Sequence, residues 1–292
     1  MSLFEGALAG LEPHQHDDGD VRYTLTVAGQ ALPLSALLGR TVAITSLGAV
    51  LCAGCGERSM VALGGGYCRR CFLSLPQCDR CFRSPEHCHH HLGTCRDPAW
   101  GSRVCMAPHV VYLAETSGLK VGITRPARTR SRWMEQGALQ ARPWLQARTR
   151  RIAGEVEARL RADVSDRTNW RQMLRHRTPD LDLARAVAEC EDRHAEGLAA
   201  LRAEFGADAL LPVQDPTTWR GRFPLPEHGA PSLHALRLVN AGDRVQGQVL
   251  GAKARYLVLD SGVFNAASHD GLLVQLELDA APATGRQGDL FG

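Results

Sequence analysis

The chain has 292 residues, 44% of them hydrophobic, and a formal net charge of +3. This length allows one large domain or two to three small ones with an ample core. No apolar run approaches the ~20 residues that a membrane-spanning helix needs. The first 20 residues also lack the basic stretch and apolar run of a secretory signal, so we expect a soluble, cytoplasmic protein.

Alternating apolar and polar residues mark the first module. The segments VRYTLTVAG and TVAITSL have the period of half-buried strands. The whole pattern predicts an α+β protein in six parts: an N-terminal β module at 1–50, a cysteine-rich zinc-binding module at 51–108, a mixed α/β domain at 109–178, a long amphipathic helix at 179–211, a C-terminal β module at 212–280 and a disordered tail at 281–292.

Nine of the ten cysteines fall in the second part. Disulfides are not expected, because the cytosol keeps thiols reduced. Each Cys-x-x-Cys pair lets two sulfurs reach one tetrahedral zinc from a tight turn. Two pairs close a four-coordinate site with no open position, so we expect a structural zinc site at Cys52, Cys55, Cys68 and Cys71.

A second structural zinc site is predicted further along, and its ligands stay open. A third pair, Cys78 and Cys81, needs two more ligands, and three further cysteines are available for those two places. Either one cysteine is not a ligand, or a histidine replaces a cysteine, or the ligands of the two sites interleave across all the pairs. Buried structural thiols and an iron–sulfur cluster are the alternatives, but three Cys-x-x-Cys repeats in a short segment favour zinc. The remaining candidates are Cys88, Cys95, Cys105, His89, His90 and His91.

The stretch HVVYLAETSGLKVGITR predicts two strands joined by a turn, and the basic segment RPARTRSRW follows it. This arrangement resembles the opening of the GIY-YIG nuclease domain. The VVY that ends at Tyr112 takes the place of the first motif, and the KVG that begins at Lys120 takes the place of the second. The resemblance implies a small mixed α/β fold with an arginine on the next helix. Arg132, which an aromatic residue follows, matches better than Arg130.

The GIY-YIG resemblance also implies a glutamate on a later helix. In RRIAGEVEARL, the apolar residues at i, i+4 and i+8 from Ile152 form a buried stripe. Glu155 has an arginine four residues away on each side, the spacing of a solvated salt-bridge ladder. Glu157 borders the stripe, so it is the better candidate for a half-buried carboxylate.

By the same resemblance, Glu157 would bind Mg²⁺ or Mn²⁺ on a phosphate oxygen. Tyr112 would help to activate water, and Arg132 with Lys120 would neutralise the developing negative charge. Lys120 stands where the family has a tyrosine, which separates this sequence from the family pattern.

Arginines greatly outnumber acids from Lys120 to Arg177, which indicates a local surface for a polyanion. A solvated helical face is the alternative. Trp133, Trp144 and Trp170 are available for base stacking. The arginines expected to contact phosphates are Arg125, Arg128, Arg130, Arg150 and Arg151.

The order of modules resembles a conserved but uncharacterised prokaryotic family, a domain of unknown function. The shared segments are GTCRDPAWG, VYLAETSGLKVGITR, RWMEQGA and SDRTNWRQML, with a weaker echo in YLVLDSGVFN. The likeness runs from about Cys52 to Leu174. It implies an architecture and assigns no activity.

The segment after Pro179 predicts one long helix. Its apolar stripe includes Cys190 and His194, which we expect to be core residues, and Gly206 is the stop signal. The strands VQGQVLG, RYLVLDSG and GLLVQLEL follow in the C-terminal β module. Whether the two β modules form one barrel-like unit stays open at this point.

The tail ends in QGDLF, which resembles the pentapeptide that binds the bacterial sliding clamp. The resemblance implies a disordered tail whose apolar residues fill a pocket while the glutamine bonds at its rim. The residues concerned are Gln287, Leu290 and Phe291.

Together these features predict a zinc-binding nucleic-acid-processing protein, a divalent-metal-dependent GIY-YIG-type DNA endonuclease of repair or replication. The expected partners are nucleic acid, DNA before RNA, and the sliding clamp, with no membrane. The alternative is a non-catalytic DNA- or RNA-binding adaptor on the same scaffold, which Lys120 in place of tyrosine favours.

Overall fold

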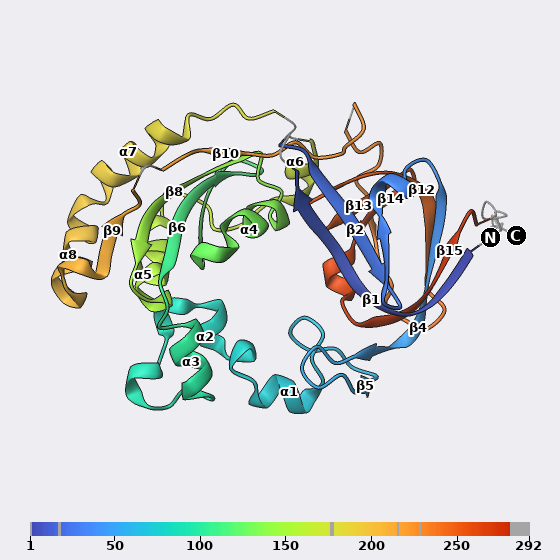
Figure 1. The fold of residues 1–292 in the computed structure, drawn as a ribbon, viewed down its shortest axis with the longest axis horizontal. Coiled ribbons are helices and arrows are strands. Elements are labelled where there is room, and N and C mark those ends of the chain that lie inside the picture. Colours follow the sequence, from blue (N-terminus) through green and yellow to red (C-terminus); the bar gives the residue numbers. More distant parts are fainter. Residues whose placement is uncertain (1, 17–18, 176–177, 215, 228, 281–292) are drawn as a thin grey trace, which may run out of the picture.

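The computed structural model describes residues 2–16, 19–175, 178–214, 216–227 and 229–280 (Figure 1). Two β-sheets lie on opposite sides of the molecule, and the cysteine-rich module, residues 51–108, connects them below. Helices cover the five-stranded sheet. The predicted α+β class is confirmed.

The larger sheet, which we call the rolled sheet, contains ten strands and joins the two β modules that the sequence treats separately. Its order is β11-β14-β13-β12-β4-β15-β1-β2-β3, with β5 paired to β4. The strands are β1 (Ser2–Gln15), β2 (Val21–Val27), β3 (Gln30–Pro33), β4 (Thr41–Leu51), β5 (Arg58–Ser59), β11 (Ala235–Leu236), β12 (Arg244–Lys253), β13 (Tyr256–Leu259), β14 (Gly262–Asn265) and β15 (Leu272–Leu278).

Strand β1 belongs to both halves of the rolled sheet. Its first part pairs with β15 over Ser2–Ala7, and its second part pairs with β2 from Leu8 onward. The register shifts between Leu8 and Leu11, where Gly10 has a φ of 90° that disfavours other residues. This bend lets one strand pair with a C-terminal strand at one end and an N-terminal strand at the other.

The five-stranded sheet has the order β10-β8-β6-β7, with β9 paired to β8. The predicted hairpin is confirmed as an antiparallel pair in which Tyr112 faces Gly122 and Ala114 faces Lys120. Its central strand, β6, is buried along its whole length. The strands are β6 (His109–Glu115), β7 (Leu119–Thr124), β8 (Gln140–Ala147), β9 (Leu210–Pro212) and β10 (Trp219–Arg220).

Helices cover both faces of this sheet. The predicted stripe of α5, at Ile152, Val156 and Leu160, packs with the leucines of α8 on one face. Helix α4 lies on the other face, where Trp133 joins the core of the rolled sheet. The α-helices are α1 (Arg69–Ser74), α2 (Arg80–Arg83), α3 (Pro98–Val104), α4 (Thr129–Glu135), α5 (Arg150–Leu160), α6 (Trp170–Arg175), α7 (Leu183–Arg193) and α8 (Ala195–Phe205).

The expectation of one long helix after Pro179 is wrong. The chain forms α7 and α8, and His194 between them has non-helical angles, φ −107° and ψ 13°. The imidazole Nε2 of His194 lies 2.9 Å from a carboxylate oxygen of Asp163, which holds the junction against the loop after α5. Cys190 is buried in the core as expected.

Short 3₁₀ turns complete the described chain, at Leu34–Ala36, Pro76–Cys78, Pro85–His87, His90–Leu92, Pro126–Arg128, Ala207–Ala209 and Ala266–His269. Among the helices of the described residues, none is both long and apolar enough to cross a membrane.

Candidate functional site

The first four predicted zinc ligands lie together. The Sγ atoms of Cys52, Cys55, Cys68 and Cys71 are all within 4.8 Å of one another. Cys52 directly follows β4, and Cys71 lies in α1, so the site joins the rolled sheet to the start of the cysteine-rich module. Four thiolates leave no open coordination position, so the tetrad fits a structural zinc ion.

The backbone around the tetrad already favours a thiolate. The N–H groups of Gly54 and Cys68 donate to the Sγ of Cys52 at 3.3 and 3.2 Å. Burial raises the pKa of Cys52, but these backbone hydrogen bonds outweigh it and lower the pKa to about 6. Burial and the neighbouring thiols raise the pKa of Cys71 to about 12. A bound cation would remove that repulsion.

The structure separates the two cysteines of the third pair, Cys78 and Cys81. A cavity of about 10 Å³ lies in the module, and Cys81 lines it while Cys78 does not. Burial raises the pKa of Cys78, and the charged neighbours that also affect it are Arg96, Cys52 and Arg83. The other cysteines that line the cavity are Cys88, Cys95 and Cys105.

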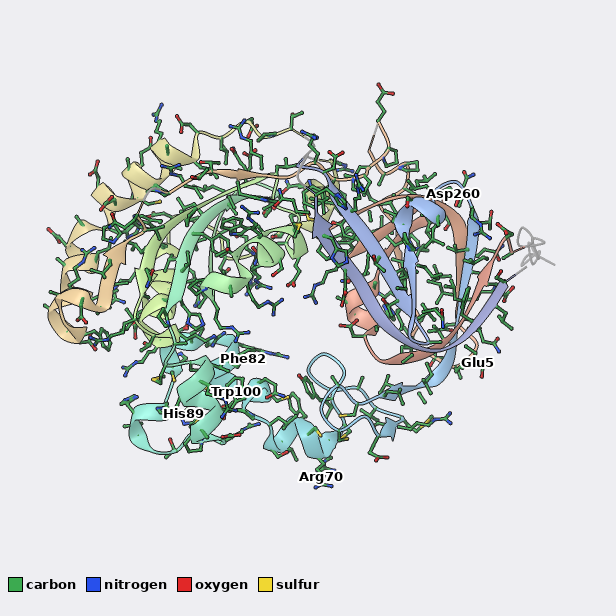
Figure 2. All side chains as sticks on the ribbon, viewed as in Figure 1. Glu5, Arg70, Phe82, His89, Trp100 and Asp260 are labelled. Carbon is green, nitrogen blue, oxygen red and sulfur yellow. The ribbon has the colours of Figure 1, made fainter. Side chains whose placement is uncertain are left out.

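The three histidines take different positions. Side-chain atoms of Asp79, Cys81 and His89 lie within 4.8 Å of one another, a second grouping that could hold a metal. The Nε2 of His90 lies 3.2 Å from the carbonyl oxygen of Pro98 and from the hydroxyl of Ser102, both in α3. His91 lies 3.3 Å from the guanidinium of Arg151. Figure 2 shows His89 beside Phe82 and Trp100, whose rings are 5.7 Å apart.

Three of the four predicted catalytic residues line one cavity of about 300 Å³, which we call the Glu157 cavity. Lys120 comes from β7, Arg132 from α4 and Glu157 from α5. Residues that the sequence did not single out also line it, among them Gln136 and Asp166. The cavity therefore combines cationic, amide and carboxylate groups from elements on both faces of the sheet.

Tyr112, the fourth predicted residue, lies directly behind this cavity. Its ring packs against Gly122 so closely that a Cβ added at Gly122 would lie 2.5 Å from the Tyr112 hydroxyl oxygen. The Tyr112 hydroxyl lies 2.8 Å from the side-chain amide of Gln136. In the amide orientation that satisfies both ends, the Gln136 nitrogen donates to this hydroxyl and the Gln136 oxygen accepts from Arg132. Burial raises the pKa of Tyr112 to about 12, although the charge of Arg132 opposes this.

Lys120 is almost fully buried at the edge of the sheet. Its Nζ donates to the carbonyl oxygen of Asp166 at 2.6 Å and to the hydroxyl of Thr168 at 3.4 Å. Burial and the positive charge of Arg132 lower the pKa of Lys120 to about 8, against the opposing effect of Glu157 and Asp166. The amine therefore titrates within the range in which enzymes are assayed.

Glu157 is the more buried of the two candidate carboxylates, with 15% of its side chain exposed. Burial raises its pKa, and Arg161, at 3.8 Å, opposes that rise. Glu155 instead forms a 2.8 Å ion pair with Arg159, as its spacing predicts. The structure thus brings Glu157, and not Glu155, to the cavity.

A larger cleft of about 800 Å³ opens next to the Glu157 cavity and shares Arg132 and Arg150 with it. The cysteine-rich module, the five-stranded sheet and the β12–β13 turn all contribute to this basic cleft. Its only lining carboxylate in the described chain is Glu135, which pairs with Arg128 and Arg255. The arginines that line it are Arg83, Arg125, Arg128, Arg132, Arg150 and Arg255.

The predicted phosphate contacts divide into two groups. Arg125, Arg128 and Arg150 line the basic cleft. Arg130 and Arg151 do not, and Arg151 instead lies over the ring of Phe205. Arg83 and Arg255 were not predicted, because they lie far from the hairpin in the sequence and reach the cleft only through the fold.

Two of the three tryptophans expected to stack on bases are not accessible. Trp133 and Trp144 are buried in the two cores, which overturns the expectation for them. Trp170 stacks on Tyr256 with ring centroids 5.6 Å apart and carries Arg171 on its ring.

The tetrad, both cavities and most of the rolled sheet fall in one matched region. Residues 39–274 match the family described as protein of unknown function (DUF2797), a longer stretch than the likeness expected from the sequence. No curated protein and no solved structure matches the chain. The match covers well over half of the sequence, so the chain belongs to this family of proteins of unknown function.

Proposed function

We propose that the protein processes nucleic acid and that its Glu157 cavity is the active site of a GIY-YIG-type DNA endonuclease. One observation carries the proposal: Lys120, Arg132 and Glu157, separated widely in sequence, line the same cavity with Tyr112 behind it. The adjoining basic cleft supports a polyanionic substrate, because clustered arginines in a low-dielectric cleft concentrate negative ligands.

The donor set fits one divalent cation. Mg²⁺ is commonly bound through one or two carboxylates, with water and substrate phosphate as its other ligands. Glu157 offers a carboxylate whose closest basic partner, Arg161, is 3.8 Å away, so an oxygen is free for such a role. A cation held there would supply positive charge to a phosphate oxygen.

The protein groups have distinct roles in this proposal. Arg132 and the Lys120 ammonium neutralise charge that develops on the phosphate. Gln136 positions the Tyr112 hydroxyl by donating to it, which leaves the phenolic proton directed away from the amide. Tyr112, fully buried behind the cavity, holds Gln136 and through it Arg132 in place at the cavity wall. Phe82 and Arg150 close the cavity wall on the side of the cysteine-rich module.

The direct test is a cleavage assay on branched, nicked and single-stranded DNA with Mg²⁺ or Mn²⁺, with a chelated sample as the control. Metal-dependent cleavage of at least one substrate is the expected result. The proposal of an endonuclease fails if the purified, zinc-loaded protein cleaves none of them with either metal.

Lys120 predicts the alkaline limb of the pH profile. Its pKa of about 8 means that the amine is cationic below that pH and neutral above it. A cationic Lys120 binds phosphate, so kcat/KM should fall as the pH rises through about 8. Lys120→Arg should remove this fall, because arginine stays charged throughout the range. An unchanged alkaline limb in Lys120→Arg would assign the titration to another group.

A second candidate, a non-catalytic nucleic-acid adaptor, is favoured by one observation. The Nζ of Lys120 already bonds to Asp166 and Thr168, where the nuclease family has a phenol. An adaptor would bind DNA or RNA with an affinity that falls steeply with salt, without turnover. Matched titrations with single-stranded DNA and RNA would separate the two ligands.

We also propose that the tail binds the replicative sliding clamp, and only its sequence supports this. Gln287, Leu290 and Phe291 lie outside the described residues. A peptide of residues 285–292 should bind a purified bacterial clamp, and replacing Leu290 and Phe291 by alanine should abolish binding. Equal binding by both peptides would contradict the proposal.

A further inference from the structure

The small cavity of the cysteine-rich module has the composition of a metal site. Four of its lining residues are cysteines, each in a different local segment: Cys81 in α2, Cys88 after the Pro85–His87 turn, Cys95 before α3 and Cys105 at the end of α3. None forms a disulfide. A volume of about 10 Å³ holds a single atom-sized occupant.

The four thiols line the same small cavity, together with Asp79, His89 and His90. The cavity is also closed by packing, because a Cβ on Gly101 would lie 3.1 Å from the Sγ of Cys95. Four cysteines around one small closed cavity match the ligand set of a structural zinc site.

The grouping of Asp79, Cys81 and His89 is a weaker set of ligands. A carboxylate oxygen of Asp79 already lies 2.9 Å from Arg96. The Nδ1 of His89 lies 2.8 Å from the hydroxyl of Thr94. A metal bound there would also leave three cavity cysteines without a role.

This cavity is tied directly to the helix that carries Glu157. The backbone N–H of Arg150, at the start of α5, donates to the carbonyl oxygen of Cys105 at 2.7 Å. The Arg150 guanidinium donates to the carbonyl oxygens of Cys81 and Phe82 at 3.1 and 2.6 Å. It also lies 4.4 Å above the Phe82 ring.

Two further contacts hold the middle and the end of α5. Gly154 packs so tightly on Pro85 that an added Cβ would lie 2.5 Å from the Cβ of that proline. Arg161, just after the helix, pairs with Glu86 at 3.1 Å. The loop between Cys81 and Cys88 therefore contacts α5 from one end to the other.

We propose that the protein binds a second zinc ion, that this ion fixes the position of α5, and that Cys78 is not a ligand. Its four ligands are Cys81, Cys88, Cys95 and Cys105. The effect on catalysis rests on the proposed nuclease function, whereas the binding of the ion does not. Without the ion, the Arg150 contacts would lose their rigid partner and Glu157 would lose its fixed position.

Zinc content tests the ligand set in the full-length protein. Wild type should contain two zinc ions per chain, and Cys81→Ala should contain one. Cys78→Ala is the matched control from the same Cys-x-x-Cys pair and should keep two. Asp79→Asn and His89→Gln should also keep two. Loss of one zinc from Cys78→Ala, Asp79→Asn or His89→Gln, or its retention in Cys81→Ala, would overturn the assignment.

Cobalt substitution of the wild type tests the same point even if a variant fails to fold. The second cobalt equivalent should add as much thiolate-to-metal charge-transfer absorption as the first, because both sites hold four cysteines. A site with Cys81 as its sole thiolate would add only about one quarter as much, and that result would refute the proposal.

Hydrogen–deuterium exchange of α5 tests the coupling. The amides of Arg150–Leu160 should exchange faster in Cys81→Ala and at the wild-type rate in Cys78→Ala. Equal exchange in both variants would refute the coupling. If the wild type has two zinc ions and a protected α5 but cleaves no DNA, the nuclease proposal fails while the second site stands.

Discussion

Glu157→Gln is expected to lower metal-dependent DNA cleavage by about 10³-fold while DNA binding changes little. The glutamine keeps the shape of the side chain but removes the charge that would hold the cation. Because the glutamate is mostly buried and its pKa is raised by burial, the neutral variant should fold at least as well as wild type. Initial cleavage rates, DNA affinity and thermal unfolding would be measured together.

Glu155→Gln is the matched control. It makes the same chemical change two residues away on the same helix, where the carboxylate pairs with Arg159. A half-buried i,i+4 pair on a helix surface contributes only about 0.3–0.5 kcal/mol, so cleavage should stay near the wild-type rate. Full activity in Glu157→Gln, or an equal loss in both variants, would remove Glu157 from the active site.

Cys71→Ala is expected to release one zinc ion and to unfold the start of the cysteine-rich module. Structural zinc supplies ~10 kcal/mol or more to small zinc-dependent folds at pH 7, which exceeds what the short helix α1 can replace. Residues 52–74 should become sensitive to proteases, whereas the rolled sheet keeps its strands. Zinc content and limited proteolysis with mass spectrometry would follow both effects.

Cys190→Ala is the control for this change. Cys190 is a buried core cysteine of α7 without a place in either cysteine group, so its loss costs packing and no metal. The variant should keep the wild-type zinc content and give the same fragments as wild type in limited proteolysis. A Cys71→Ala protein that retains its zinc and resists proteolysis would contradict the assignment of the tetrad.

The parts of the site that the sequence predicts depend on local spacing. The hairpin follows from two alternating segments and a turn, and its pairing of Tyr112 with Gly122 needs no distant information. The choice of Glu157 over Glu155 follows from helix periodicity alone. The first tetrad needs only two Cys-x-x-Cys pairs and a short connection.

The parts that the sequence does not predict depend on contacts between distant segments. The pairing of β1 with β15 joins residues more than 260 positions apart. The local pattern of either β module therefore does not predict that the two modules form one sheet. Arg255 reaches the basic cleft from that sheet. The separation of Cys78 from Cys81 depends on how α2 packs, which a spacing rule does not describe.

The split pairing of β1 also determines the order in which the chain can fold during synthesis. The tetrad, the five-stranded sheet and the helices all lie between β4 and β12, so they leave the ribosome before β15 exists. Until then the first half of β1 has an unpaired edge, which is open to pairing with other chains. Such distant pairing is slow to form. The rolled sheet is therefore expected to close last, after the Glu157 cavity has formed.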